Sequence, residues 1–193
     1  MKKILVIILS CCLLQSCISS RSKPSSFYGL RSIEIEVGGV FTSINKKILI
    51  NTVNIPNYID RPQIVTVKNN KIEYVIDETN RWIEPLGILM QNVIAENMQN
   101  YLINSTVRTF GVNERSYDYL VNVDVKRIDA VFGDAVYFEC MYNVVNNRQN
   151  VMVSKKFVNN VKLDTDYVGL VNGISEVVSN LALDIIKSIK NGR

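Results

Sequence analysis

Histidine is absent from the 193-residue sequence. This absence excludes Ser-His-Asp and Cys-His catalysis, zinc sites with histidine ligands, and simple pH switching by histidine. The excess of one charge sign is also small, since the sequence has 22 basic and 18 acidic residues. A dedicated nucleic-acid-binding protein would show a basic patch or stripe, so we expect no nucleic-acid partner.

The first residues have the layout of an export signal. Lys2 and Lys3 give a positive start, and residues 4–14 form an apolar run. That run is about half of the roughly 20 apolar residues that a membrane-spanning helix needs. A charged start followed by a short apolar stretch is typical of a signal peptide. We therefore expect residues 1–16 to be a signal peptide.

A lipidation motif closes this segment. Leu14-Gln15-Ser16-Cys17 follows the lipobox pattern of an aliphatic residue, a variable position, a small residue and a cysteine. We expect cleavage before Cys17 and acylation of this cysteine. The acyl and diacylglycerol groups on Cys17 would be the covalent additions to the chain, and we expect no other cofactor and no metal site.

Two alternatives to lipidation at Cys17 stay open. Cys11 ends a second lipobox-like run, but only about six apolar residues precede it, the short edge of what a signal peptide tolerates. The other alternative is a plain secretory signal with incidental cysteines. Residues 18–26 are rich in serine, proline and charge, which is the composition of a flexible tether. We therefore predict a lipidated tether at residues 17–26 and one folded domain at residues 27–193.

The residue after Cys17 bears on the destination of a lipoprotein. An aspartate there commonly signals retention in the inner membrane of Gram-negative bacteria, and this chain has Ile18. We therefore expect a lipid anchor at the periplasmic face of the outer membrane. Each buried methylene contributes about 0.8 kcal/mol and one acyl chain holds only reversibly, so a diacylglycerol with a further chain would anchor stably.

Cleavage before Cys17 would leave 177 residues, enough for one domain with its own core. The mature chain would keep 20 basic and 18 acidic residues, a near-neutral balance. Cys140 would be the only other cysteine, so no internal disulfide can form. No electropositive side chains surround Cys140 in the sequence, and we expect a buried, unreactive thiol within a strand.

Strand patterns dominate most of the mature chain. We expect strands at residues 27–30, 33–37, 47–53, 64–68 and 72–76, and the last two flank Asn69-Asn70-Lys71 as a hairpin. Further alternating segments at 121–125, 136–144 and 151–158 are separated by short polar or glycine-containing turns. These three consecutive segments are typical of an antiparallel meander.

Two segments have the three- and four-residue apolar spacing of helices. The first starts at Pro85, which suits a first-turn position, and its apolar stripe ends near Asn104. The second runs from Tyr167 to Ile189, with Asp164 or Asp166 as a candidate cap. We predict an α+β fold: a single domain with a mostly antiparallel sheet and two long helices packed on one face. Alternatively, the apolar stripe of the second helix would face a partner helix or a membrane.

Two short blocks carry the most specific signal in the sequence. The first consists of Pro56, Tyr58, Ile59, Asp60, Arg61, Pro62, Gln63, Ile64 and Val65, and the second of Arg81, Trp82, Glu84, Pro85 and Leu86. The order and spacing of the two blocks, and the helix expected after them, resemble the pattern of the ABC-type transport auxiliary lipoprotein family. The early Tyr28-Gly29-Leu30 agrees as well, whereas the C-terminal half departs in detail from the family pattern.

The resemblance implies a non-catalytic subunit of an envelope lipid-transport system. Its expected partners are an MCE-domain protein that bridges the periplasm and an inner-membrane permease and ATPase, and a homo-oligomer would suit a docking collar. The candidate partner-binding residues are Tyr58, Asp60, Arg61, Arg81 and Trp82, because interface anchors favour Tyr, Trp and Arg.

The same residues also have a structural interpretation. Arg61 and Arg81 would each pair with a carboxylate, such as Asp60 or Glu84, and the cluster would pin the first helix against the sheet. The main alternative function is a lipoprotein that binds a lipid or a small apolar ligand. An enzyme using two carboxylates and an assembly factor for another envelope machine are weaker alternatives.

Overall fold

A computed structural model describes residues 24–33, 41, 43–109, 116–147 and 150–191. The predicted signal peptide, Cys17, the alternative Cys11 and most of the predicted tether lie outside these residues. The structure therefore does not test the predicted lipidation or the predicted tether boundary.

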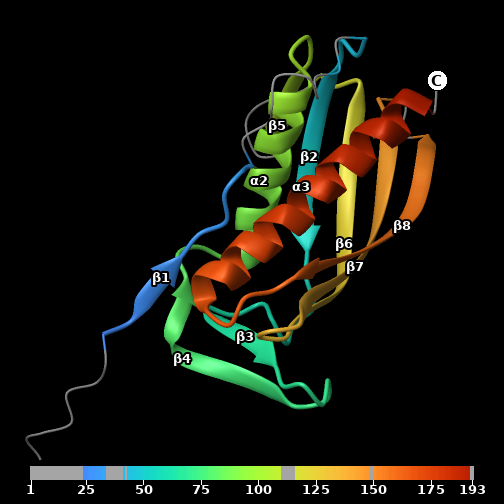
Figure 1. The fold of residues 1–193 in the computed structure, drawn as a ribbon. Helices are drawn as coiled ribbons and strands as arrows, with labels where there is room; N and C mark the ends of the chain where they lie inside the picture. Colours follow the sequence, from blue (N-terminus) through green and yellow to red (C-terminus); the bar gives the residue numbers. More distant parts are fainter. Residues whose placement is uncertain (1–23, 34–40, 42, 110–115, 148–149, 192–193) are drawn as a thin grey trace, which may run out of the picture.

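The described residues form eight strands in two sheets and two helices (Figure 1). The smaller sheet has the order β1 (Ser26–Tyr28), β4 (Tyr74–Trp82), β3 (Gln63–Val67). The larger sheet has the order β5 (Thr106–Thr109), β2 (Lys47–Asn54), β6 (Tyr119–Ala130), β7 (Ala135–Asn146), β8 (Val151–Lys162). The helices are α2 (Leu86–Tyr101) and α3 (Tyr167–Asn191).

The fold class predicted from the sequence is confirmed, and the structure adds a division into two sheets. Both helices cover the same face of the five-stranded sheet (Figure 1). The longest pairings, β6 with β7 and β7 with β8, are antiparallel as the meander pattern predicts. β2 pairs in parallel with both β5 and β6, which no local pattern in the sequence indicated.

The meander alternates as expected between a core face and an outer face. In β6, Val121, Val123 and Val125 are at most 2 % exposed and point to the helices, while Asn122 and Asp124 lie on the other side. The turn to β7 places Gly133 at φ 74°, in the left-handed region that glycine adopts at little steric cost.

Helix α3 is the main partner of this core face. Its buried positions recur along one stripe from Leu170 to Ile189, and Asp166 Oδ1 caps its start by accepting a 2.6 Å hydrogen bond from the N–H of Gly169. By length and composition α3 resembles a membrane-spanning helix, but 67 % of its apolar window is buried inside the structure. The stripe therefore packs on the sheet, as the first of the two interpretations predicted.

Helix α2 lies close against β2 at its N-terminal end. A β-carbon on Gly87 would lie 2.7 Å from the carbonyl oxygen of Val53, so only glycine permits this approach. One turn further, the Gln91 amide donates a buried 3.0 Å hydrogen bond to the carbonyl oxygen of Ile50, beside an irregularity in the pairing of β2 with β6. These two contacts fix where α2 begins relative to the large sheet.

The segment after β1 crosses the two helices without forming a strand. The backbone N–H of Arg31 bonds Ser175 Oγ of α3 at 3.3 Å, and that of Ile33 bonds Asn97 Oδ1 of α2 at 3.1 Å. The strand predicted at residues 33–37 is thus absent at its first residue, and residues 34–37 lie outside the described part.

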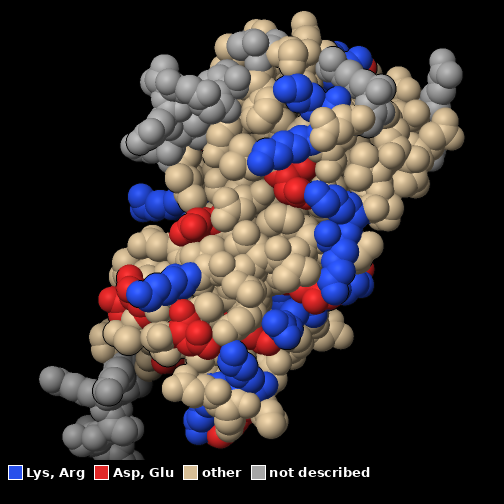
Figure 2. All heavy atoms as spheres, turned by 45° about the vertical axis from the view of Figure 1, so that its right-hand side comes forward, with Lys and Arg blue, Asp and Glu red and all other residues tan. Residues whose placement is uncertain are grey.

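Several charged side chains on the surface form ion pairs. On the face that Figure 2 shows, basic and acidic residues lie next to one another over much of the area. Lys155 pairs with Asp184 at 2.7 Å and Lys156 with Glu139 at 2.8 Å. Neighbouring charges of opposite sign fit the near-neutral composition.

Candidate docking site

The two sequence blocks meet at the open end of the β3–β4 hairpin. The N–H of Trp82 donates a 2.7 Å hydrogen bond to the carbonyl oxygen of Pro62, and Gln63 lies opposite Arg81 in the antiparallel pairing. β4 then ends at Trp82, and α2 begins at Leu86 after three intervening residues. The hairpin therefore brings the end of the first block beside the start of the second.

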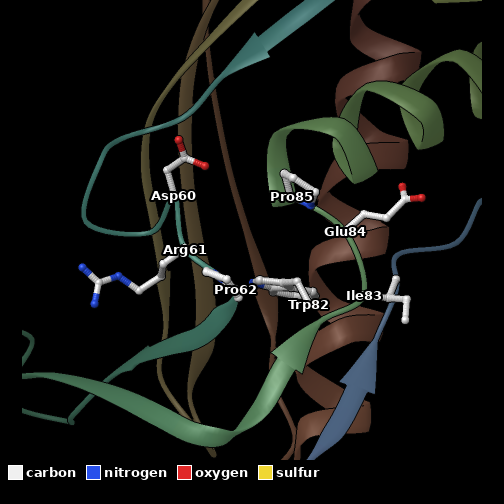
Figure 3. A pocket seen from close by; sticks show the side chains of 7 residues that line it. All are labelled: Asp60, Arg61, Pro62, Trp82, Ile83, Glu84 and Pro85. Atoms are coloured by element: carbon white, nitrogen blue, oxygen red, sulfur yellow. The ribbon is translucent and has the colours of Figure 1, made fainter.

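Between the blocks lies a surface hollow of about 340 Å³, which we name the motif hollow (Figure 3). Its lining residues are Asp60, Arg61, Pro62, Trp82, Ile83, Glu84 and Pro85. Trp82 is 5 % exposed and joins the core, while the neighbouring Ile83 is 60 % exposed. The hollow thus has a fixed aromatic wall and an accessible aliphatic edge.

The two carboxylates of the motif hollow have no ion-pair partner within the described residues. Asp60 and Glu84 are both exposed, and they lie on either side of Pro85 in Figure 3. Arg81 does pair with a carboxylate, but its partner is Glu78 and neither Asp60 nor Glu84. Its guanidinium lies 3.6 Å from Glu78, and its Nε donates to the Glu78 carbonyl oxygen.

An irregularity in β4 explains this difference for Arg81. Strict alternation would put Arg81 and Glu78 on opposite faces of β4, but the pairing of β4 with β3 shifts register between Ile76 and Arg81, and this irregular stretch lets Arg81 reach Glu78. Arg61 extends away from the hollow in Figure 3, and no ion pair joins it to another residue of the described ranges. Its Nε is buried without a hydrogen-bond partner.

Tyr58 lies outside the motif hollow. Its ring packs edge-on against Tyr74 with centroids 5.1 Å apart, and Tyr74 donates a 3.3 Å hydrogen bond to Asp129 of β6. Burial, followed by the charge of Asp129, raises the pKa of Tyr58 to about 12. Tyr58 therefore helps to attach the β3–β4 hairpin to the large sheet, which supports its structural interpretation.

The N-terminal strand is joined directly to the second block. The N–H of Ile83 donates a 2.8 Å hydrogen bond to the carbonyl oxygen of Tyr28, and the Tyr28 hydroxyl bonds Asn80 at 3.0 Å. Ile83 and Glu84 were not among the predicted binding residues. The sequence places an isoleucine between a tryptophan and an acidic residue here. It does not show that this isoleucine faces solvent, and only exposure marks it as a candidate binding residue.

Cys140 lies where the sequence predicts. It is fully buried in β7, and burial, followed by the charges of Asp184, Asp124 and Glu139, raises its pKa to about 12. Within the described ranges no group of three His, Cys, Asp or Glu residues has the geometry of a metal site. The two blocks line a surface hollow with an apolar wall and acidic residues at its edges.

The comparison with known families decides the identity. The family model for the ABC-type transport auxiliary lipoprotein component matches residues 30–186. The chain belongs to this family. It is therefore an auxiliary lipoprotein component of an ABC-type transport system. Membership places it on a membrane of the cell envelope. The family is not a known enzyme family.

Solved structures share the fold of this auxiliary lipoprotein. A crystal structure of an uncharacterised protein superposes with a TM-score of 0.71 and 19 % identity, covering 86 % of this chain and 99 % of that one. The protein XCC0632 from Xanthomonas campestris superposes with a TM-score of 0.65 and 15 % identity, covering 83 % and 92 %. No curated protein sequence matches the chain.

Proposed function

We propose that this chain is a non-catalytic outer-membrane subunit of an MCE/ABC-type lipid-transport system, and that it docks the periplasm-spanning MCE protein through the motif hollow. The supporting observation is that the two blocks that carry the family resemblance line one exposed hollow at the start of α2. Residues needed only for folding would be expected to face the core, whereas Asp60, Pro62 and Glu84 of the two blocks are exposed.

The position of β1 supports docking near the membrane. Cys17 lies nine residues before Ser26, and nine extended residues span at most about 30 Å. Because β1 pairs with the last residues of β4, an acyl group on Cys17 would hold the motif hollow close to the bilayer surface. The outer-membrane end of a periplasmic bridge would reach the subunit there.

A pull-down with matched surface variants tests the proposal. Ile83→Glu places a charge at the motif hollow, and Ile103→Glu places the same charge at a position of equal exposure, 59 %, beyond the end of α2. We expect Ile83→Glu to abolish capture of the MCE protein and Ile103→Glu to leave it unchanged. Equal capture by both folded variants would remove the hollow from this role.

Fatty-acid labelling tests the anchor. We expect a clickable fatty acid to label the protein and its Cys11→Ala variant, and the Cys17→Ala variant to stay unlabelled. Label on Cys17→Ala would contradict the proposed anchor.

Native mass spectrometry of the labelled protein counts the copies in the proposed homo-oligomer.

The alternative function, binding of a lipid or small apolar ligand, would need a surface hollow. The space between the large sheet and the helices is filled by side chains such as Ile94, Phe138 and Leu181, each at most 1 % exposed. The motif hollow is near the lower limit of roughly 300 Å³ for small-molecule sites. A lipid that co-purifies with the protein in native mass spectrometry would favour this alternative.

A further inference from the structure

A second hollow adjoins the motif hollow and lengthens it into a groove. It has a volume of about 340 Å³ and shares Asp60 and Pro85 with the first. Its other lining residues are Thr52, Val53, Asn54, Ile55, Asn57, Gly87 and Ile88. The groove therefore passes over Pro85 between the loop that precedes β3 and the first turn of α2, a shape that suits a chain segment.

The walls of this groove leave apolar surface accessible to water. Ile83 on one side is 60 % exposed and Ile88 on the other is 43 % exposed, and both belong to secondary structure or its direct continuation. Fully burying one such side chain contributes about 1.5–3 kcal/mol. An apolar side chain of a partner that covers both isoleucines would gain from this burial.

The lining of the groove contains two acidic residues, Asp60 and Glu84, and one basic residue, Arg61. Neither Asp60 nor Glu84 takes part in an ion pair with any residue in the described ranges. The two nearby arginines do not neutralise them, because Arg81 pairs with Glu78 and Arg61 extends away (Figure 3). Two free carboxylates beside an apolar wall are complementary to a cation carried on an apolar stem.

We infer that the groove takes an extended segment of the MCE protein that carries a lysine or arginine next to an apolar residue. The inference rests on the proposed docking function and adds to it the chemistry of the docked segment. The basic side chain lies between Asp60 and Glu84, and the apolar residue packs on Trp82 and Ile83. An anionic lipid headgroup or phosphate fits less well, because the two carboxylates outnumber the one arginine in the lining.

The N-terminus of α2 gives the carboxylates a second, purely structural effect. No side chain caps this helix and its first turn contains no acidic residue, so Glu84 next to it is stabilised by the helix dipole. This effect stabilises the folded protein and does not contribute to partner binding. Measuring both the affinity for the partner and the thermal unfolding of the protein therefore separates the two effects.

The test uses the double variant Asp60→Asn, Glu84→Gln, with Asp164→Asn, Glu96→Gln as control, since both control positions are exposed and lie outside the groove. Binding of the purified MCE protein is titrated between low and high salt. We expect the groove variant to bind about tenfold more weakly at low salt and to lose most of its salt dependence, while the control keeps both.

Trp82 supplies an independent signal, because it is the only tryptophan and it lines the groove. The capped tripeptide acetyl-Leu-Lys-Leu-amide should change its fluorescence at millimolar concentration, and acetyl-Leu-Glu-Leu-amide should not. Unchanged affinity and salt dependence in the groove variant would overturn the inference. If Ile83→Glu still abolished binding, docking at the hollow would stand and only the cationic segment would be wrong. If Ile83→Glu also bound normally, the proposed function itself would fail.

Discussion

The hydroxyl of Tyr167, in the first turn of α3, donates a 2.6 Å hydrogen bond to Oδ2 of Asp77 in β4, 90 residues away in the sequence. Asp77 Oδ1 accepts three further hydrogen bonds, from the backbone N–H groups of Thr79 and Asn80 and from the Thr79 hydroxyl. The small sheet is thereby attached to the helix that covers the large sheet. The Tyr167 ring also contacts Tyr28 at 5.9 Å, which ties β1 to the same point.

This pair predicts an acid-dependent loss of stability. Burial opposes ionisation of Asp77, but the hydrogen bonds from Tyr167, Asn80 and Thr79 outweigh it and hold the pKa of Asp77 below its usual value. A lowered folded-state pKa contributes stability above the unfolded value of about 3.9 and loses it as the pH falls through the folded value. We expect the free energy of unfolding to decrease steadily below about pH 5.

Tyr167→Phe removes one of those hydrogen bonds. We expect a loss of about 1–2 kcal/mol at pH 7 and a weaker dependence on acid, measured by urea unfolding at several pH values. Tyr137→Phe is the control, because its hydroxyl hydrogen bonds, to Asp134 and from Lys71, are both exposed, and their loss should cost about 0.5 kcal/mol or less. Equal losses in the two variants would contradict the anchoring role of Tyr167.

Gly87→Ala should destabilise the protein although alanine favours helices. The added β-carbon would lie 2.7 Å from the Val53 carbonyl oxygen, so the start of α2 must shift from β2. We expect a loss of about 1–3 kcal/mol by thermal or urea unfolding. Asn100→Ala, at an exposed position of the same helix, should be neutral or stabilising. Unchanged stability of Gly87→Ala would mean that α2 does not approach β2 so closely.

Trp82→Ala should act on folding first. Trp82 is 5 % exposed and belongs to the core, and truncation of a buried tryptophan costs about 3–5 kcal/mol. We expect a large fall in the urea midpoint of this variant, whereas Ile83→Glu should unfold close to the wild type. A Trp82→Ala protein of normal stability would show that the tryptophan is not part of the core.

The thiol of Cys140 should stay unreactive in the folded protein. Its raised pKa of about 12 keeps it protonated at pH 8, and Cys140 is fully buried. With Cys17 acylated, we expect Ellman's reagent to detect no thiol in the native lipoprotein and one thiol per chain in guanidinium chloride. Rapid reaction of one thiol in the folded state would contradict the burial of Cys140.

Local patterns predicted the elements but not the assembly of the sheets. The apolar stripe after Tyr167 gave α3, and the alternation around Val123 gave β6, because both signals are carried by neighbouring residues. The parallel pairing of Ile50 with Val121 joins segments separated by β3, β4, α2 and β5. Such a pairing depends on packing of the whole chain, and no local spacing encodes it.

The candidate site was predicted in part for the same reason. The two blocks indicated where the site lies, and Asp60, Arg61 and Trp82 do line the motif hollow. Arg81 pairs with Glu78 and not with Asp60 or Glu84, because β4 is irregular between Ile76 and Arg81, and no local pattern encodes that irregularity. Tyr58 does not line the hollow, and its contact with Tyr74 joins the loop before β3 to β4, which local sequence does not show.

Site-specific photo-crosslinking tests the docking account most directly. A photoreactive phenylalanine analogue at position 83, in cells that express the complete transport system, should form an adduct with the MCE protein. The same analogue at position 103 has equal exposure and should form none. Absence of the adduct at position 83, or equal adducts at both positions, would contradict docking through the motif hollow.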